Sequence, residues 1–283
     1  MNRIDNCFAR LRSEKRKGFI PYICAGDPSL EKAVDLARAL EKAGADIIEL
    51  GIPFSDPLAD GIVNQLAAQR ALAAGATVRG VLECVREIRC HSEVPIVLYT
   101  YLNPIFQFGF DKFHGDAEAA GVDGLLILDL PPEEDVNARE LDRLKQSNFE
   151  AVERGNVEGD NVFHIRLIAP TTSPERMKKI AAKARGFLYY VSREGVTGEQ
   201  KTISSTLGAT VTQLRGVTSL PIAVGFGISN PEQAREVANH ADAVVVGSAI
   251  VDLIAKHGKG SKLIEKVGVF ARSIADAIKS VRD

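Results

Sequence analysis

Eight short apolar segments recur along this chain of 283 residues, and helical patterns lie between them. The segments are short and hydrophobic without alternation, which is typical of parallel strands covered on both faces. They are residues 19–24, 47–50, 96–99, 125–128, 163–168, 187–191, 222–224 and 243–246. Eight strand–helix repeats without a linker predict an α/β fold, one closed (β/α)8 TIM barrel spanning residues 1–283 as a single domain, with an extra N-terminal helix. An open, doubly wound sheet is the alternative.

The helical segments are marked by their periodicity and by their starts. Apolar residues recur at spacings of three and four within residues 78–88 and 267–278. A capping residue beside a proline marks three helix starts, at residues 27–29, 173–175 and 229–232. The connection 146–161 is polar and long for a barrel of this kind. Because it leads into a strand, we expect it to be a solvated excursion on the face opposite the active site.

Composition excludes several functional classes. The chain is 45% hydrophobic with a net charge of −2, so it offers no basic surface for nucleic acid or an anionic membrane. No apolar segment approaches the roughly 20 residues of a membrane span, and the first six residues do not have the apolar core expected of a signal peptide. The four cysteines have no CxxC spacing and the five histidines are scattered. We therefore expect a cytoplasmic protein with reduced thiols and no metal site.

A carboxylate inside an apolar strand is the first chemical signal. Glu49 lies within the second strand, where an unpaired carboxylate costs several kcal/mol of desolvation. Asp60 ends the proline-containing loop that follows, and barrel active sites form at the C-terminal ends of the strands. Two carboxylates in different surroundings predict proton transfer to and from carbon, with Glu49 and Asp60 as catalytic residues. A buried ion pair is the alternative for Glu49.

Glycine-rich loops after the seventh and eighth strands predict a phosphate site. Gly225 and Gly227 follow the seventh strand, and Gly247-Ser248 opens a helix after the eighth. Backbone N–H groups and a helix N-terminus bind anions, and barrels often bind phosphate at these two loops. The alternative is that these glycines form tight turns without a ligand.

Other polar residues follow the remaining strands. After the sixth strand, residues 192–198 are polar and flanked by glycine, as a closing lid would be, although an ordinary loop has the same composition. For Asp129, capping of a turn is the alternative to substrate binding, and for Tyr101 and Tyr189 it is packing. The polar strand-end set also contains Asn103, Arg193 and Thr197.

Together these segments resemble the tryptophan synthase α chain family over about residues 2–280. The motif of residues 49–61, ELGIPFSDPLADG, is the most specific. The other matching motifs are Ala25-Gly26-Asp27-Pro28, Tyr101-Leu102-Asn103-Pro104, Asp129-Leu130-Pro131, residues 192–198 (SREGVTG), Gly225-Phe226-Gly227-Ile228 and Gly247-Ser248-Ala249-Ile250.

The resemblance implies a lyase of tryptophan biosynthesis that cleaves indole-3-glycerol phosphate to indole and glyceraldehyde 3-phosphate by retro-aldol chemistry. It implies no cofactor in this chain, pyridoxal phosphate in a β chain partner, and an αββα tetramer. The exposed loops around residues 53–57 and 103–104 would meet the β chain. One alternative is a non-catalytic α-like subunit that only activates the β chain, although such a chain should have lost Glu49 or Asp60. Another is a different phosphosugar barrel; an indole-glycerol-phosphate synthase would need a strand-end lysine, which is absent here.

The resemblance also implies residue roles. Glu49 would protonate the ring and then accept a hydroxyl proton, aided by the raised pKa that apolar surroundings give a carboxyl group. Asp60 would hold the ring N–H, and Thr197 would tie the lid to Asp60. The other substrate-binding residues would be Tyr22, Asn64, Tyr101, Asp129 and Tyr189, and the phosphate-binding residues Gly198, Gly227, Gly247 and Ser248.

Three positions depart from the family pattern. Asn64 stands where the family commonly has an aliphatic residue, and Tyr22 and Tyr99 are more polar than the residues usual at their positions. We expect these changes to alter affinity and ring orientation rather than the chemistry.

Overall fold

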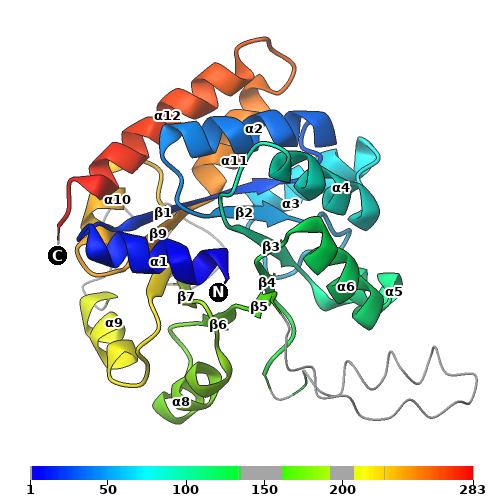
Figure 1. Cartoon of the computed structure of the whole chain (residues 1–283). Helices are drawn as coiled ribbons and strands as arrows, with labels where there is room; N and C mark the ends of the chain where they lie inside the picture. The colour runs from blue at the N-terminus through cyan, green and yellow to red at the C-terminus, as the bar shows by residue number, and fades with distance from the viewer. Residues whose placement is uncertain (1, 133, 135–160, 192–206, 226, 283) are drawn as a thin grey trace, which may run out of the picture.

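A ring of parallel strands surrounded by helices forms the centre of the molecule (Figure 1). The computed structural model describes residues 2–132, 134, 161–191, 207–225 and 227–282. The strands are β1 (Gly18–Cys24), β2 (Ile48–Gly51), β3 (Ile96–Thr100), β4 (Gly124–Ile127), β5 (Phe163–His164), β6 (Arg166–Ile168), β7 (Leu188–Val191), β8 (Ile222–Gly225) and β9 (Ala243–Val246).

The strand order shows that the ring is closed. The strands follow the order β5-β4-β3-β2-β1-β9-β8-β7-β6, so the first strand pairs with the last. β5 pairs with β4 and β6 pairs with β7, and Ile165 alone separates β5 from β6 in the sequence. The predicted strand 163–168 is thus one strand that changes partner at Ile165. The predicted (β/α)8 barrel is confirmed, and the open sheet is wrong.

Helices cover the outside of the ring. They are α1 (Arg3–Ser13), α2 (Leu30–Ala43), α3 (Ile62–Ala73), α4 (Val78–Arg89), α5 (Leu102–Phe108), α6 (Phe110–Ala120), α8 (Pro174–Lys183), α9 (Leu207–Arg215), α10 (Pro231–Ala238), α11 (Ser248–His257) and α12 (Leu263–Lys279). The side chains of Ser29, Ser173 and Asn230 each accept a hydrogen bond from a backbone N–H in the first turn of α2, α8 and α10. The predicted helix starts are confirmed, because each has the oxygen-bearing cap that its first turn requires.

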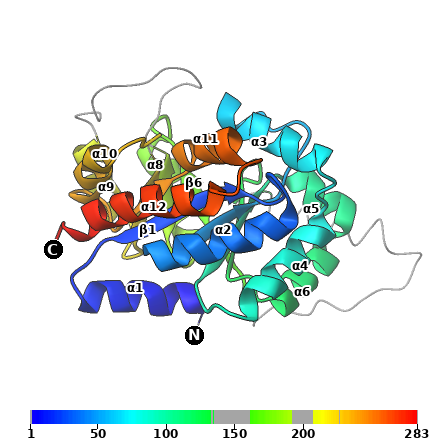
Figure 2. The ribbon, with the colours of Figure 1, turned by 90° about the horizontal axis from the view of Figure 1, so that it is seen from above.

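Helix α1 is the predicted extra helix, and it fills one end of the ring. Its apolar residues Ile4, Phe8 and Leu11 belong to one buried cluster with inward-facing strand residues such as Ile20 and Val97. In Figure 2, α1 runs along one edge of the molecule, and α3 and α11 lie at the opposite edge. The interior is therefore packed at the N-terminal ends of the strands, as barrel interiors are.

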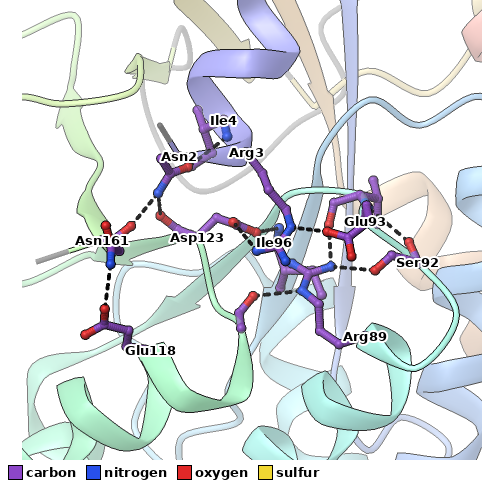
Figure 3. A network of polar contacts seen from close by, with 12 residues as sticks. Asn2, Arg3, Ile4, Arg89, Ser92, Glu93, Ile96, Glu118, Asp123 and Asn161 are labelled. Carbon is purple, nitrogen blue, oxygen red and sulfur yellow. Dashed lines mark hydrogen bonds and ion pairs between the residues drawn. The ribbon is translucent and has the colours of Figure 1, made fainter.

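A polar network joins α1 to the strands at this end (Figure 3). The carboxylate of Asp123 accepts hydrogen bonds from Arg3 at 3.1 Å, from Arg89 at 2.6 Å and from the backbone N–H of Ile96 at 2.8 Å. Asn161 also lies here, bonded to Asn2, as expected of a connection that enters a strand from this face. Residues 146–160 of that connection lie outside the described residues.

Two further expectations concern the whole chain. All four cysteines are free thiols, and Cys7, Cys24 and Cys84 are buried. Within the described ranges, the helices are all too short or too polar to span a membrane.

Candidate functional site

A cavity of about 300 Å³ opens at the C-terminal ends of the strands, opposite α1. Eight of the predicted site residues line it: Tyr22, Glu49, Asp60, Asn64, Tyr189, Gly227, Gly247 and Ser248. Three of these residues lie in strands, three lie in loops that follow strands and two lie in helices, so barrel closure brings them together. In the described part of the chain, no group of His, Cys, Asp or Glu residues is arranged to hold a metal ion.

Glu49 lies in the middle of β2, opposite Tyr22 of β1 and Val97 of β3. Its side chain is 1% exposed, and its Oε1 atom has no hydrogen-bond partner among the described residues. Burial, and secondarily the charge of Asp60, raises the pKa of Glu49 to about 8. No ion pair of Glu49 occurs within the described ranges, which disfavours the buried-ion-pair alternative. A carboxyl group in this state is protonated at neutral pH and can act as an acid.

Asp60 lies at the end of the loop between β2 and α3 and is 6% exposed. Tyr99 donates a hydrogen bond to its Oδ1 atom and Tyr101 donates one to its Oδ2 atom, both at 2.8 Å. Asn64 adds a longer bond to Oδ1 at 3.4 Å. Burial raises the pKa of Asp60, and the three donors oppose this effect because they stabilise the ionised form. The two carboxyl groups thus have different surroundings, one apolar and one rich in donors.

Two predicted substrate-binding residues lie outside the cavity lining. Tyr101 stands behind Asp60, where its hydroxyl group donates to the carboxylate and accepts the backbone N–H of Ala59 at 3.0 Å. Asp129 is exposed, and its Oδ1 atom accepts the backbone N–H of Leu102 at 2.6 Å, at the start of α5. The alternative that Asp129 is a capping residue therefore describes its geometry. Its carboxylate caps the start of α5 rather than the turn that follows its own strand.

Asn64 and Tyr22 define the side of the cavity nearest Asp60. The Oδ1 atom of Asn64 is buried and has no partner within the described residues. The rings of Tyr22 and Tyr99 pack edge to face with their centroids 5.0 Å apart. The three positions that depart from the family pattern, Tyr22, Asn64 and Tyr99, therefore make this side of the cavity aromatic and polar.

The predicted phosphate loops also line the cavity, and Gly247 lies beside Tyr22. Gly227 has a φ of +66°, in the left-handed region that favours glycine. Gly247 precedes the first residue of α11, Ser248, and both line the cavity, so the N-terminus of this helix lies at the cavity. Gly198, like Arg193 and Thr197 of the expected lid, lies outside the described residues.

Sequence reasoning missed part of the lining. Tyr99 was noted only as a departure, yet it lines the cavity and contacts Asp60. The apolar residues Leu128, Leu167, Ala169, Val191 and Val245 also line the cavity. Strand alternation is the signal that finds them, because every second residue of a barrel strand points inward.

Comparison with known proteins identifies the family. The family model described as "Tryptophan synthase alpha chain" matches residues 8–279. The tryptophan synthase alpha chain of Opitutus terrae is 46% identical over 280 residues, covering 99% of this chain and 100% of the relative. That of Citrifermentans bemidjiense is 45% identical over 278 residues, covering 98% of each.

Solved structures agree with this match. The crystal structure of the tryptophan synthase alpha chain from Legionella pneumophila has a TM-score of 0.83 and 39% identity, covering 99% of this chain and 98% of that one. A structure of Mycobacterium tuberculosis tryptophan synthase has a TM-score of 0.83 and 31% identity, covering 98% of each chain. The similarity therefore extends over the whole barrel.

Proposed function

The chain belongs to the tryptophan synthase alpha chain family, and we propose that Glu49 and Asp60 perform its cleavage reaction. The chain is a lyase of tryptophan biosynthesis that converts indole-3-glycerol phosphate to indole and glyceraldehyde 3-phosphate. One observation carries the residue assignment: a buried carboxyl group with a pKa of about 8 shares a cavity with a carboxylate held by three donors.

Glu49 supplies the proton that starts the reaction. Protonation of C3 of the indole ring gives the protonated form of the indolenine tautomer, in which the ring nitrogen carries positive charge. Asp60 accepts a hydrogen bond from the ring N–H and stabilises that charge. An ionised group fixed in position before the charge develops lowers the barrier, since no reorganisation is needed.

The same Glu49 completes the cleavage. Having lost its proton, it accepts the proton of the glycerol hydroxyl group next to the ring. The C–C bond then breaks, its electron pair returns to the ring, and the hydroxyl carbon becomes the aldehyde of glyceraldehyde 3-phosphate. Glu49 ends protonated, as it began, so the cycle needs no external acid or base.

The phosphate group of the substrate is assigned to the wall formed by Gly227, Gly247 and Ser248. The positive end of α11 suits a dianion, because its first N–H groups and the helix dipole both favour an anion. Gly198 is assigned to the same group, and Thr197 to a contact between the lid and Asp60. Tyr22, Asn64 and Tyr189 are assigned to the ring and the glycerol chain; for Tyr101 and Asp129 the geometry supports roles in positioning Asp60 and the start of α5.

The family's alpha chain binds no cofactor itself, and we assign pyridoxal phosphate to the β chain. Every group required by the two proton transfers is present in the described cavity. We further propose that residues 1–283 act as one domain, because the ring uses strands from both halves of the chain and α12 packs on α2. We also assign the chain to the cytoplasm, where free thiols stay reduced.

The family implies a β chain partner, and we propose an αββα assembly with a docking strip beside the cavity. Leu58, Ile62 and Leu66 are 88%, 63% and 44% exposed, and they lie on the loop after β2 and on one side of α3. Exposed apolar residues that cluster mark interaction surfaces. Leu58→Glu should weaken binding of the β chain at least tenfold in a titration. Val269→Glu, at a 67% exposed position on α12, is the matched control and should leave it unchanged.

Indole release from indole-3-glycerol phosphate tests the chemistry. Glu49→Gln removes the transferable proton and should lower kcat by a factor of about 100 or more. Asp60→Asn removes the charge that stabilises the cation and should lower kcat by a factor of about 100 to 1,000. Glu93→Gln, at a surface carboxylate on the opposite end of the barrel, is the control and should retain full activity.

The same assay separates the alternatives. A non-catalytic activator would release no indole, and its stimulation of the β chain would survive Glu49→Gln. Substantial turnover by the Glu49→Gln variant would contradict the role assigned to Glu49.

A further inference from the structure

Two tyrosines from the same strand end hold the carboxylate of Asp60. Tyr99 belongs to β3, and Tyr101 follows two residues later, so their side chains leave the backbone on the same face. Each donates to a different oxygen atom, Tyr99 to Oδ1 and Tyr101 to Oδ2, at 2.8 Å. Rotation of the carboxylate would therefore break both bonds.

The hydroxyl groups of Tyr99 and Tyr101 differ in the other contacts that they make. Tyr101 also accepts the backbone N–H of Ala59, so it helps to hold the loop itself. The hydroxyl group of Tyr99 bonds to Asp60, and no contact between Tyr99 and the loop backbone is found within the described residues. The ring of Tyr99 is held separately by Tyr22, against which it packs edge to face. Removing the hydroxyl group of Tyr99 thus changes the carboxylate while leaving its surroundings in place.

We propose that Tyr99 is a positioning residue, which keeps Asp60 ionised and aims its carboxylate at the ring N–H of the substrate. This inference rests on the proposed function, in which Asp60 stabilises the ring cation. Asp60 can accept about four hydrogen bonds, and three are made within the protein. Because Asp60 lines the cavity, its remaining acceptor capacity is available to the ring N–H of a bound substrate.

Neutral donors are what stabilise the charge on Asp60. The titratable groups that interact with it in the described part of the chain come from four strands and their ends: Tyr22 and Cys24 of β1, Glu49 of β2, Tyr99 of β3 with Tyr101 directly after it, and Tyr189 of β7. None of these groups is a cation, and the hydrogen bonds from Tyr99, Tyr101 and Asn64 are the effects that lower the pKa of Asp60. Burial raises the pKa of Tyr99 well above its ordinary value, so its hydroxyl group remains a donor throughout the working range.

The pH dependence of kcat/KM tests the proposal. Activity needs ionised Asp60 and protonated Glu49, so the acid limb reports Asp60 and the alkaline limb reports Glu49. Loss of a donor to the ionised form raises the pKa of Asp60. Tyr99→Phe should therefore move the acid limb to higher pH by about one unit, equal to about 1.4 kcal/mol, and leave the alkaline limb in place.

A second replacement should produce the opposite sign. Site-specific exchange of Tyr99 for difluorotyrosine makes the phenol a stronger donor at nearly constant volume, and should move the acid limb to lower pH. Carbon-13 NMR titration of the Asp60 carboxyl carbon should show the same two shifts in the free protein without turnover. Tyr190→Phe removes a buried hydroxyl group from the outer side of β7 and should move neither limb.

The outcomes separate this inference from the proposed function. If wild type and Tyr99→Phe have the same acid limb of kcat/KM and the same pKa of Asp60 by NMR, the proposed role of Tyr99 is wrong. A merely structural role would lower activity at every pH without displacing a limb. Full activity of Asp60→Asn would instead overturn the proposed function itself.

Discussion

Replacement of Glu49 by glutamine should inactivate the enzyme and should also remove a loss of stability that grows as pH rises towards neutrality. Glu49 is 1% exposed, and its pKa rises from an ordinary value of 4.5 to about 8. Below the lower value, the carboxyl group is neutral in both the folded and the unfolded chain. Between the two values, the unfolded chain ionises freely whereas the folded chain retains the proton, so stability falls as pH rises.

The loss of unfolding free energy can be worked out from the raised pKa of Glu49. Each pH unit between the two pKa values costs about 1.4 kcal/mol of unfolding free energy. From about pH 5 to about pH 7, the loss due to Glu49 is therefore on the order of 2 kcal/mol. Glu49→Gln has nearly the same shape but cannot ionise, so the variant escapes this loss.

Urea unfolding of wild type and Glu49→Gln at the two pH values measures the effect. The difference between the two proteins should grow by about 2 kcal/mol from the lower to the higher pH, in favour of the variant. Comparing the change between pH values cancels the constant difference between an amide and an acid. Glu93→Gln, at a carboxylate that is 79% exposed, should show no such growth. A pH-independent difference for Glu49→Gln would refute a raised pKa, and with it the proposed acid role.

Three other predictions follow from the cavity and the opposite end of the barrel. Asn64→Ile removes a buried oxygen that has no partner in the described structure, and it restores apolar contact with the substrate. The KM should therefore fall about fivefold, equivalent to about 1 kcal/mol, and a higher KM would contradict the pocket assignment. Gly227→Ala places a side chain on a backbone with φ of +66°, which costs about 1 kcal/mol. This variant should show a smaller rise in thermal midpoint when inorganic phosphate is added. Gly115→Ala on α6, where the added Cβ meets open space, should show the same rise as the wild type. Asp123→Ala leaves the nearly buried guanidinium of Arg89 without its carboxylate partner, and it should lower the unfolding free energy by about 3–5 kcal/mol while kcat stays unchanged. A fall in kcat of the folded variant would show coupling between the two ends.

The sequence alone predicts the architecture because its signals are local. A strand buried on both faces has to be continuously apolar, and a helix on the barrel surface has to repeat its apolar residues every three or four positions. The eight strands and the starts of α2, α8 and α10 follow from these periods and caps. Glu49 could be found in the same way, since a carboxylate in an apolar strand conflicts with its own surroundings.

Tertiary structure alone decides which side chains meet. Tyr99 reaches Asp60 across 39 positions of sequence, and the pattern of β3 does not reveal whether that hydroxyl group finds a carboxylate or solvent. Asp129 carries the same strand-end signal as the cavity residues, yet its carboxylate turns to the first N–H of α5. Both outcomes depend on how the strands are staggered when the ring closes, and that stagger comes from packing of the whole barrel rather than from any one segment.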